Sequence, residues 1–469
     1  MELHYLELTE LADLLRRREV TSVEVTRAQL DRIEHLDGHL MSYVRVTPEQ
    51  ALAAAEAADR EIAAGRYRGP LHGVPLGIKD LFWLKGVPAA AGTVVFRDFI
   101  PEQDASVVAR LKQAGAVLLG KLQMTEGAYS DHHPAMAAPK NPWDPTYWTG
   151  ISSSGPAVAT AAGLCYGSLA SDTGGSIRWP CGATGLSGIK PAWGRASRHG
   201  VFELAASLDH VGPIARTAAD AAAIFGAIAG ADEKDPTTLA YPQSDHPVLA
   251  NMDVRGVRIG IDRRWNTVDV DAAVQSALLE AERVFRQLGA EIVSLRAPDV
   301  TQAVIDWAPA CALEAAFAYR ETYPSRKDAF GPVLSSVLEA GRSVSALAYQ
   351  AIRLRRMDLR GRFTDLLRSI DGLLLPVQPY APLTLTEIRT LGDQPALIVK
   401  LQRYTAPFNL TGHPTITLPG GFSDGMPIGL QLAGLDEITL CRMAMAFQRV
   451  TPWHRRHPLD MPVAGKKVL

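Results

Sequence analysis

The sequence predicts an α/β fold, in which helices cover a mixed or parallel β-sheet that is mostly buried. Short apolar segments bounded by glycine and proline alternate with longer amphipathic stretches along most of the chain, as in α/β proteins. The composition, 47% hydrophobic and 21% charged, is that of a globular protein, and 469 residues suffice for a large core. Because no linker, low-complexity tract or internal repeat interrupts the chain, we expect one large domain over residues 1–469.

The chain begins with helical patterns. Residues 9–36 predict two helices, because apolar residues recur at helical intervals and Thr21-Ser-Val-Glu24 has the spacing of a capping box. Residues 49–65, rich in Glu and Ala, predict another helix. From Gly69 we expect short strands separated by turns, then a helix over 105–115 and a buried strand over 116–120.

The remaining elements continue this alternation. A helix of small residues over 155–165 is expected to pack closely on the sheet, and an alanine-rich helix is expected over 217–230. A strand–helix–strand unit is predicted over 256–261, 270–288 and 290–295. A long charged helix over 343–370 leads to a buried strand at 372–376, which completes the α/β pattern.

Charge and hydropathy argue against several functions. The net charge is −2 and the isoelectric point about 6.6, so the chain lacks the overall basic character of nucleic-acid-binding proteins. The longest apolar run, residues 221–229, is far short of the roughly 20 residues that span a membrane. The N-terminus is acidic and has no secretory pattern. We therefore expect a cytoplasmic protein without nucleic-acid or membrane partners.

Three short patterns suggest other functions but lack essential parts. Gly115-Ala-Val-Leu-Leu-Gly-Lys-Leu122 is close to a P-loop but ends in Leu, where Ser or Thr should reach magnesium. Ser187-Gly-Ile-Lys190 has Ser-x-x-Lys spacing without the companion motifs of penicillin-recognising enzymes. His132-His133 beside Asp131 lacks further metal-ligand spacing, so a loop or pocket role is expected. We expect no metal and no cofactor, and buried thiols for the scattered Cys165, Cys181, Cys311 and Cys441.

A lysine and two serines on turns form the strongest chemical pattern. Lys79 lies in the apolar segment 77–80, and Ser152 and Ser176 lie in two turns rich in serine and glycine, 24 residues apart. The glycines before Ser176 let backbone N–H groups converge, where they would stabilise an oxyanion. A serine nucleophile needs a base, and Lys79 can serve if burial lowers its pKa so that it is neutral. Ser152 could relay the proton between them, so the sequence predicts a hydrolase.

Together with the motifs that surround these residues, the chain resembles the amidase signature family. The resemblance runs from about Gly69 to Ala219, with weaker features toward the C-terminus. It is carried by Pro75-Leu-Gly-Ile-Lys-Asp80, Gly120-Lys-Leu-Gln-Met-Thr-Glu126, Lys140-Asn-Pro-Trp143, Ser152-Ser-Ser-Gly155, Asp172-Thr-Gly-Gly-Ser-Ile-Arg178, Gly188-Ile-Lys-Pro191, Ser207-Leu-Asp-His-Val-Gly-Pro213, Pro407-Phe-Asn-Leu-Thr-Gly-His-Pro414 and Pro427-Ile-Gly-Leu-Gln431. It implies a large mixed β-sheet sandwiched between α-helices, with N-terminal helices at about 1–65, the signature core at about 66–220 and a C-terminal α/β part at about 221–469.

The resemblance also implies roles for the site residues. Ser176 corresponds to the nucleophile, Ser152 to a bridging serine after a cis peptide bond, and Lys79 to the base. The implied oxyanion donors are the backbone amides of Thr173, Gly174, Gly175 and Ser176. Asp172 and Arg178 match positions that support the nucleophile turn.

Two residues depart from the family pattern near the expected substrate pocket. Ile151 stands where a small residue is usual, and Ser154 where glycine is usual. Because a β-branched side chain is stiff, Ile151 is expected to reshape the pocket. Other large residues near the motifs would suit an apolar or aryl-bearing substrate, or belong to the core; they are Phe82, Trp83, Met124, Tyr129 and Trp148.

The predicted activity is hydrolysis of the C–N bond of a small amide through a Ser176 acyl-enzyme. A carbamate substrate, which would make the protein a urethanase, and an ester remain open. One alternative is the glutaminase A subunit of a tRNA-dependent amidotransferase, which residues 172–191 and 207–213 resemble and which needs partner subunits and a polar glutamine pocket. Another is an inert binding or scaffold protein, against which the intact lysine and serines argue. Monomer and homodimer are both open.

Overall fold

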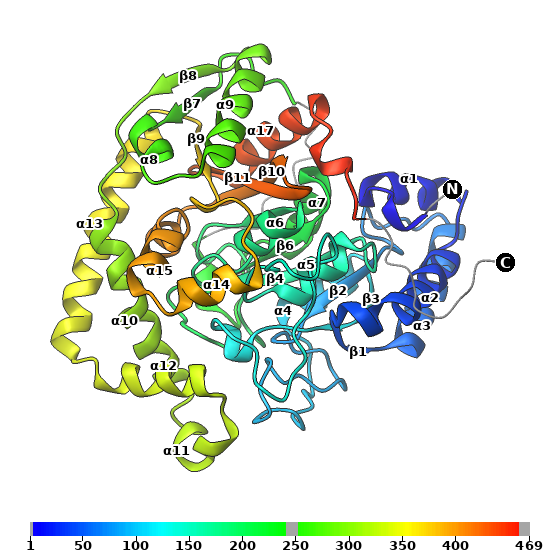
Figure 1. Cartoon of the computed structure of the whole chain (residues 1–469). Helices are drawn as coiled ribbons and strands as arrows, with labels where there is room; N and C mark the ends of the chain where they lie inside the picture. Colours follow the sequence, from blue (N-terminus) through cyan, green and yellow to red (C-terminus); the bar gives the residue numbers. More distant parts are fainter. Residues whose placement is uncertain (1–2, 241–251, 459–469) are drawn as a thin grey trace.

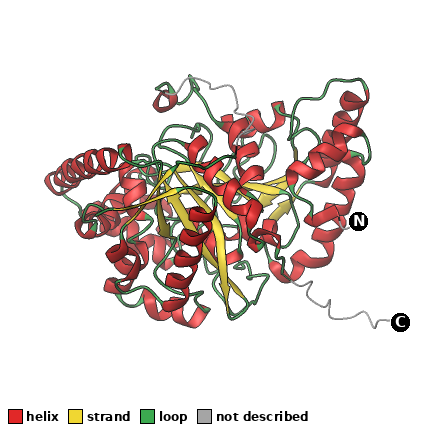
Figure 2. Cartoon of the chain, turned by 90° about the horizontal axis from the view of Figure 1, so that it is seen from above, coloured by secondary structure: helices red, strands yellow, loops and turns green. Residues whose placement is uncertain are grey.

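In the described part of the chain, an eleven-stranded sheet runs through the middle of the protein, with helices on both sides of it (Figure 1; Figure 2). The computed structural model describes residues 3–240 and 252–458. Residues 1–2, 241–251 and 459–469 of the predicted domain lie outside the described part. The mixed sheet between helices confirms the predicted α/β fold class.

The sheet combines two parallel parts with an antiparallel middle. Strands β3, β2 and β4 are parallel, as are β9, β7 and β8, and antiparallel pairs connect the two parts. In spatial order the strands are β1 (Tyr43–Val46), β3 (Val117–Leu122), β2 (Pro75–Lys79), β4 (Gly167–Asp172), β6 (His210–Ala215), β5 (Ser187–Lys190), β10 (Thr415–Ser423), β11 (Met426–Ala433), β9 (Gly372–Pro376), β7 (Arg258–Ile261) and β8 (Glu291–Ser294). The strands from β3 to β6 are buried along their whole length, because helices cover both faces.

The described residues form seventeen α-helices. They are α1 (Leu8–Arg17), α2 (Ser22–Leu40), α3 (Pro48–Ala63), α4 (Ser106–Gln113), α5 (Ser154–Ala161), α6 (Arg178–Thr184), α7 (Ala218–Ile228), α8 (Arg263–Thr267), α9 (Ala272–Gln287), α10 (Thr301–Ala318), α11 (Tyr323–Arg326), α12 (Pro332–Ser343), α13 (Ala346–Arg368), α14 (Leu385–Gly392), α15 (Pro395–Gln402), α16 (Ala406–Thr411) and α17 (Glu437–Val450). In Figure 1, α10, α12 and α13 lie together on the left of the molecule, on the side opposite α1 to α3.

Most predicted helices are present within a few residues of their expected ends. The capping box at the start of α2 forms as predicted: the Thr21 hydroxyl accepts from the Glu24 N–H (3.1 Å), and the Glu24 carboxylate accepts from the Thr21 N–H (2.8 Å). Helix α5 is shorter than predicted and ends at Ala161. Gly163 has a φ of 67°, a left-handed conformation that breaks the helix before residue 165.

The segments whose patterns we did not interpret as functional sites belong to the core of the fold. The P-loop-like segment forms β3, where the buried Lys121 pairs with Asp80 (Nζ to Oδ1, 3.0 Å). Residues 187–190 form β5. All four cysteines are buried free thiols, as predicted. In the described ranges, no helix is both long enough and apolar enough to cross a membrane.

Candidate active site

The predicted site residues gather at one edge of the sheet, where β2 and β4 end. These two strands are parallel neighbours, so their carboxyl ends meet at the same edge. Lys79 is the last residue of β2, and Asp172 is the last residue of β4. The turn with Ser176 follows β4, and Ser152 lies just before α5. Sites at the carboxyl ends of parallel strands are usual in α/β proteins.

Lys79 is completely buried and its amino group contacts three serine hydroxyls. Its Nζ lies 2.6 Å from Ser152 Oγ, 2.9 Å from Ser153 Oγ and 2.9 Å from Ser171 Oγ. The Ile151–Ser152 peptide bond is cis, as the resemblance implied. Ser153 and Ser171 were not predicted as site residues, since neither matches a role that the motifs carry. The structure thus brings Lys79 and Ser152 into direct contact.

Burial gives Lys79 the properties of a base. It lowers the pKa of Lys79 to about 7, while the negative charges of Asp172 and Asp209 oppose this shift. An ammonium group donates three hydrogen bonds, and a neutral amine donates two and accepts one. The Ser153 hydroxyl donates its proton to the Ser171 carbonyl (3.2 Å), so the Lys79 lone pair would accept from Ser152 or Ser171. The contacts suit a lysine that exchanges a proton with Ser152.

Asp172 holds the turn that carries Ser176. Its carboxylate accepts from the N–H groups of Gly175 (2.9 Å) and Ile177 (3.0 Å). Arg178 binds the same carboxylate through Nε (3.0 Å) and Nη2 (2.9 Å). Burial alone would raise the pKa of Asp172, but the charge and hydrogen bonds of Arg178 outweigh burial and hold that pKa well below its usual range. The turn therefore closes around a buried carboxylate anion.

Asn409 ties α16 to this buried pair. Its side-chain N–H group donates to Asp172 Oδ1 (2.8 Å) and to the Asp172 carbonyl (3.0 Å), and its oxygen accepts from Arg178 Nη2 (2.5 Å). Arg178 also donates to the Thr405 carbonyl (2.9 Å). Asn409 lies in the family motif at 407–414, which could have identified it, but the motif alone gave it no role.

Asp209 supports the start of the same turn. Its carboxylate accepts from the Thr173 hydroxyl (2.7 Å) and from the N–H groups of Leu204 (3.0 Å) and Ala205 (3.1 Å). Burial raises the pKa of Asp209 to about 6, although these hydrogen bonds and the charge of Arg198 oppose the rise. The side chain of Thr173 is therefore held by a carboxyl group behind the turn.

The residues expected around the substrate pocket fall into two groups. Phe82 and Met124 are completely buried in the main apolar core, so their role is packing rather than lining a pocket. Trp148, Ile151 and Trp179 lie together in a smaller apolar cluster beside the site, where the two indole rings are 6.1 Å apart. The partly exposed Trp83 packs against aromatic residues of the main cluster. Half-buried Tyr129 stacks on Trp307, with ring centres 6.3 Å apart.

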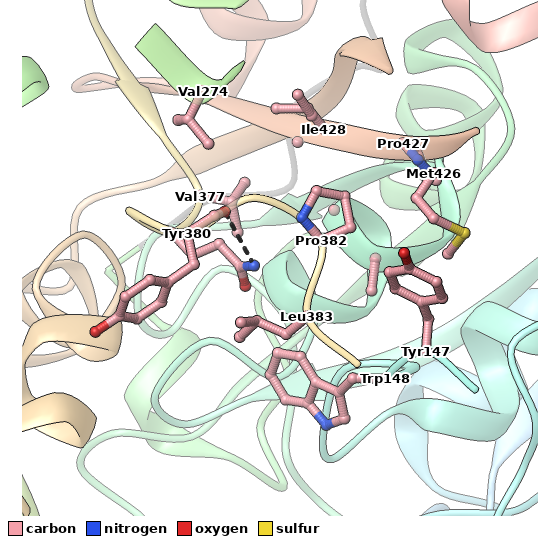
Figure 3. Close-up of a pocket in the computed structure, with 14 residues that line it drawn as sticks. Tyr147, Trp148, Val274, Val377, Tyr380, Pro382, Leu383, Met426, Pro427 and Ile428 are labelled. Atoms are coloured by element: carbon pink, nitrogen blue, oxygen red, sulfur yellow. Dashed lines mark hydrogen bonds between the residues drawn. The ribbon is translucent and has the colours of Figure 1, made fainter. Parts of the chain in front are cut away.

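Trp148 also borders a mostly apolar pocket next to this cluster. The pocket lies between the end of α6, the start of β11 and the loop after β9, and Figure 3 shows the Trp148 indole beside Leu383. Its walls are formed by Tyr147, Trp148, Gly182, Ala183, Val274, Val377, Gln378, Tyr380, Pro382, Leu383, Met426, Pro427, Ile428 and Gly429. The surroundings of Ile151 and Trp148 are therefore apolar and aromatic.

His132 has a neighbour that the sequence did not suggest. Its Nε2 lies 3.1 Å from the hydroxyl of Ser154, the second residue that departs from the family pattern. Burial lowers the pKa of His132 to about 4, so the imidazole is neutral at pH 7. Within the described residues no group of three or more His, Cys, Asp or Glu is arranged to hold a metal ion. His132 thus braces the serine-rich turn, in keeping with the expected loop role.

Comparison with known proteins identifies the family of the chain. The amidase family model matches residues 24–437. The chain is 49% identical over 457 residues to the putative amidase AmiD of Mycobacterium tuberculosis, covering 97% of this chain and 96% of AmiD. It is 37% identical over 484 residues to the A subunit of glutamyl-tRNA(Gln) amidotransferase from Chloroflexus aggregans, covering 97% and 99% of the two proteins. The structure of the peptide amidase from Stenotrophomonas maltophilia superposes with a TM-score of 0.84 at 28% identity, covering 97% and 98%.

The fold and these relatives define an amidase-type hydrolase. The chain belongs to the amidase family, whose members share the amidase signature, and is an enzyme that hydrolyses C–N bonds.

Proposed function

We propose that the chain hydrolyses a small apolar or aryl-bearing amide without partner subunits, through an acyl-enzyme on Ser176. The observation that carries this proposal is the contact of the buried Lys79 with Ser152 at 2.6 Å. A lysine with a pKa lowered to about 7 is partly neutral near neutral pH and can accept a proton. A carbamate would react by the same steps, because it also presents a carbonyl carbon bonded to nitrogen.

In the proposed mechanism, neutral Lys79 takes the proton of Ser152 while Ser152 takes the proton of Ser176. Ser176 Oγ forms a bond to the substrate carbonyl carbon, and the carbonyl oxygen becomes an anion. The proton then returns through Ser152 to the leaving nitrogen, the C–N bond breaks, and an ester on Ser176 remains. Water is activated by the same relay, adds to the ester carbon and releases the acid, which restores the Ser176 hydroxyl.

The backbone amides of Thr173, Gly174 and Ser176 are the donors that we assign to the oxyanion. The Gly175 amide belonged to the expected set, but it donates to Asp172 and is therefore left out. Donors that are fixed before the reaction stabilise the developing charge without reorganisation. Asp172, Arg178 and Asn409 hold the turn and stay outside the reaction itself.

The apolar surroundings support the proposed substrate class. Ile151, Trp148 and Trp179 form an apolar cluster next to the cis Ile151–Ser152 peptide, and the rings of Tyr129 and Trp307 stack on each other. Such walls favour a substrate with an apolar or aromatic acyl group over glutamine, the zwitterionic substrate of an amidotransferase subunit. The 37% identity to the amidotransferase subunit keeps glutamine hydrolysis as the second candidate.

The purified chain alone provides the test. We expect turnover of aryl and alkyl amides, and little turnover of glutamine. Ser176→Ala should abolish turnover and labelling by a fluorophosphonate probe, whereas Ser276→Ala, on the exposed face of α9, should change neither. Glutaminase activity with no turnover of other amides would favour the amidotransferase subunit. Probe labelling at a serine other than Ser176 would overturn the assigned nucleophile.

A further inference from the structure

We infer that Trp307 is a positioning residue for the oxyanion hole. Its indole N–H orients and polarises the peptide unit whose own N–H, on Gly174, is one of the assigned oxyanion donors. This inference rests on the proposed function, because Trp307 would act on the reaction that we assign to Ser176. Trp307 itself lies outside the family motifs.

The contact joins two segments that are distant in sequence. Trp307 lies in the middle of α10, and its Nε1 donates to the Thr173 carbonyl at 2.8 Å. This carbonyl and the Gly174 N–H belong to one planar peptide unit and point in opposite directions. Fixing the carbonyl direction therefore fixes the direction in which the Gly174 N–H points.

The hydrogen bond also strengthens the opposite end of the peptide unit. Hydrogen bonds in series polarise one another, so a peptide whose carbonyl accepts a bond has a more strongly donating N–H. Trp307 is 7% exposed, and water therefore competes little with this contact. We expect the loss of this bond to destabilise the transition state, in which the carbonyl oxygen of the substrate becomes an anion, and to leave substrate binding unchanged.

The indole ring itself lies against the turn. A Cβ atom built on Gly174 would lie 2.5 Å from Cζ2 of Trp307, closer than real side chains approach. Thr173 is held from the other side by the Asp209 carboxylate, which accepts from its hydroxyl at 2.7 Å. Thr173 is thus fixed at both its side chain and its carbonyl, which makes the following amide rigid before substrate arrives.

The test replaces the indole by rings without its N–H group. Trp307→Phe and Trp307→Tyr keep an aromatic ring against Gly174 and lose the bond to the Thr173 carbonyl. Trp143→Phe is the matched control, since the Trp143 Nε1 donates to the Thr184 carbonyl at 2.9 Å, at the far end of α6 from the nucleophile turn. Active sites are counted with a fluorophosphonate, so that rates refer to folded enzyme only.

We expect kcat to fall about tenfold in both Trp307 variants with KM within twofold, a smaller loss than the 100-fold or more for removing a donor outright. The inhibition constant of a trifluoromethyl ketone, whose adduct places an anionic oxygen in the hole, should rise by the same factor. The binding of the carboxylic acid product should not change. Trp143→Phe should lower the melting temperature without these kinetic effects.

Three outcomes separate the possible errors. If Ser176→Ala is inactive while both Trp307 variants keep the wild-type kcat and ketone affinity, the role of Trp307 is wrong and the proposed function stands. If Ser176→Ala keeps its activity, the proposed function itself fails. A loss of ketone affinity in Trp143→Phe equal to that in Trp307→Phe would show a general packing effect and would also overturn the inference.

Discussion

At the scale of single residues, the proposed mechanism depends on the protonation state of Lys79. Lys79 is the proposed base, and its pKa is lowered to about 7 by burial. A protonated lysine cannot accept the Ser152 proton, so kcat/KM for an amide should rise with pH and level off above an apparent pKa near 7. Lys79→Met should lose several orders of magnitude in turnover, and its residual rate should show no step near pH 7.

A pH–rate series over about pH 5 to 9 checks this prediction. The exposed Lys85 offers a control, and Lys85→Met should keep the wild-type profile. A step near pH 7 that persists in Lys79→Met would assign the titrating group to another residue.

Ile151 is a residue that we expect to influence the choice of substrate. It is half-buried, packs against the cluster that contains Trp148 and Trp179, and directly precedes Ser152. Removing its branched side chain should open space, so Ile151→Gly should raise the ratio of kcat/KM for a bulky aryl amide over a short alkyl amide about tenfold. Ile151→Ala should act in the same direction but less strongly.

Specificity constants for a series of amides of increasing size measure this effect. Ile388→Ala provides the comparison, because Ile388 belongs to the same cluster but lies on α14 and not in a serine-rich turn. Identical substrate rankings in the wild type and both Ile151 variants would remove Ile151 from the pocket wall.

Part of the candidate site could be predicted from the sequence, and part could not. Lys79 and the two turns were evident because a lysine among apolar residues and serines among glycines are unusual local patterns. Ser171 and Trp307 have no such local signal, since each acts through a contact with a distant segment. The bond from Trp307 to Thr173, for example, spans 134 residues and depends on how α10 packs on the turn. Asp209 lies in the motif at 207–213, but the motif alone gave it no role.

At the scale of elements, helix α16 contacts the residues that hold the turn with Ser176. Asn409 on this helix binds both Asp172 and Arg178, which are completely buried. Asn409→Leu keeps the approximate volume but leaves parts of this charged pair unsatisfied. The free energy of unfolding should fall by about 3 kcal/mol, and kcat should fall because the Ser176 turn loses a constraint.

Urea unfolding and steady-state kinetics on the same samples measure both effects. The control is Asn266→Leu, since Asn266 on α8 is also buried and donates to the Leu374 carbonyl (3.0 Å) outside the site. Asn266→Leu should lose stability but keep kcat. Full kcat in Asn409→Leu would show that the turn keeps its shape without α16.

Some elements were predictable from periodicity and others were not. Helices α2 and α9 have one buried face, so their apolar residues recur at helical intervals. The hairpin of β10 and β11 was not predicted, because β11 is buried along its whole length and shows no alternation. Helix α10 was missed as well; it contains Pro309 and many apolar residues, which obscure the helical pattern.

At the scale of the whole molecule, the site costs the fold some stability. The amino group of Lys79 is buried at the carboxyl end of β2, a strand inside the sheet, and the shift of its pKa to about 7 measures the cost of burying its charge. Below pH 7, Lys79 is charged in both the folded and the unfolded chain, so the full cost of burying the charge is present. Above pH 7 the folded chain releases the proton first, and the cost decreases until the unfolded lysine also loses its proton near pH 10.5.

The wild type should therefore gain stability relative to Lys79→Met as the pH rises from about 7 to about 10.5. The folded protein binds fewer protons than the unfolded chain in this window, which makes the slope positive, at roughly 1 kcal/mol per pH unit. Methionine at position 79 cannot form the hydrogen bonds of Lys79 with the three serines. This loss changes the stability difference between the two proteins by the same amount at every pH, so it does not affect the slope.

Urea unfolding of both proteins at several pH values measures the slope directly, and the stability of Lys85→Met is expected to change with pH in parallel with that of the wild type. A difference between wild type and Lys79→Met that stays constant from pH 7 to pH 10 would show that Lys79 is not neutral in the folded enzyme, and with that the lysine base of the mechanism would be lost.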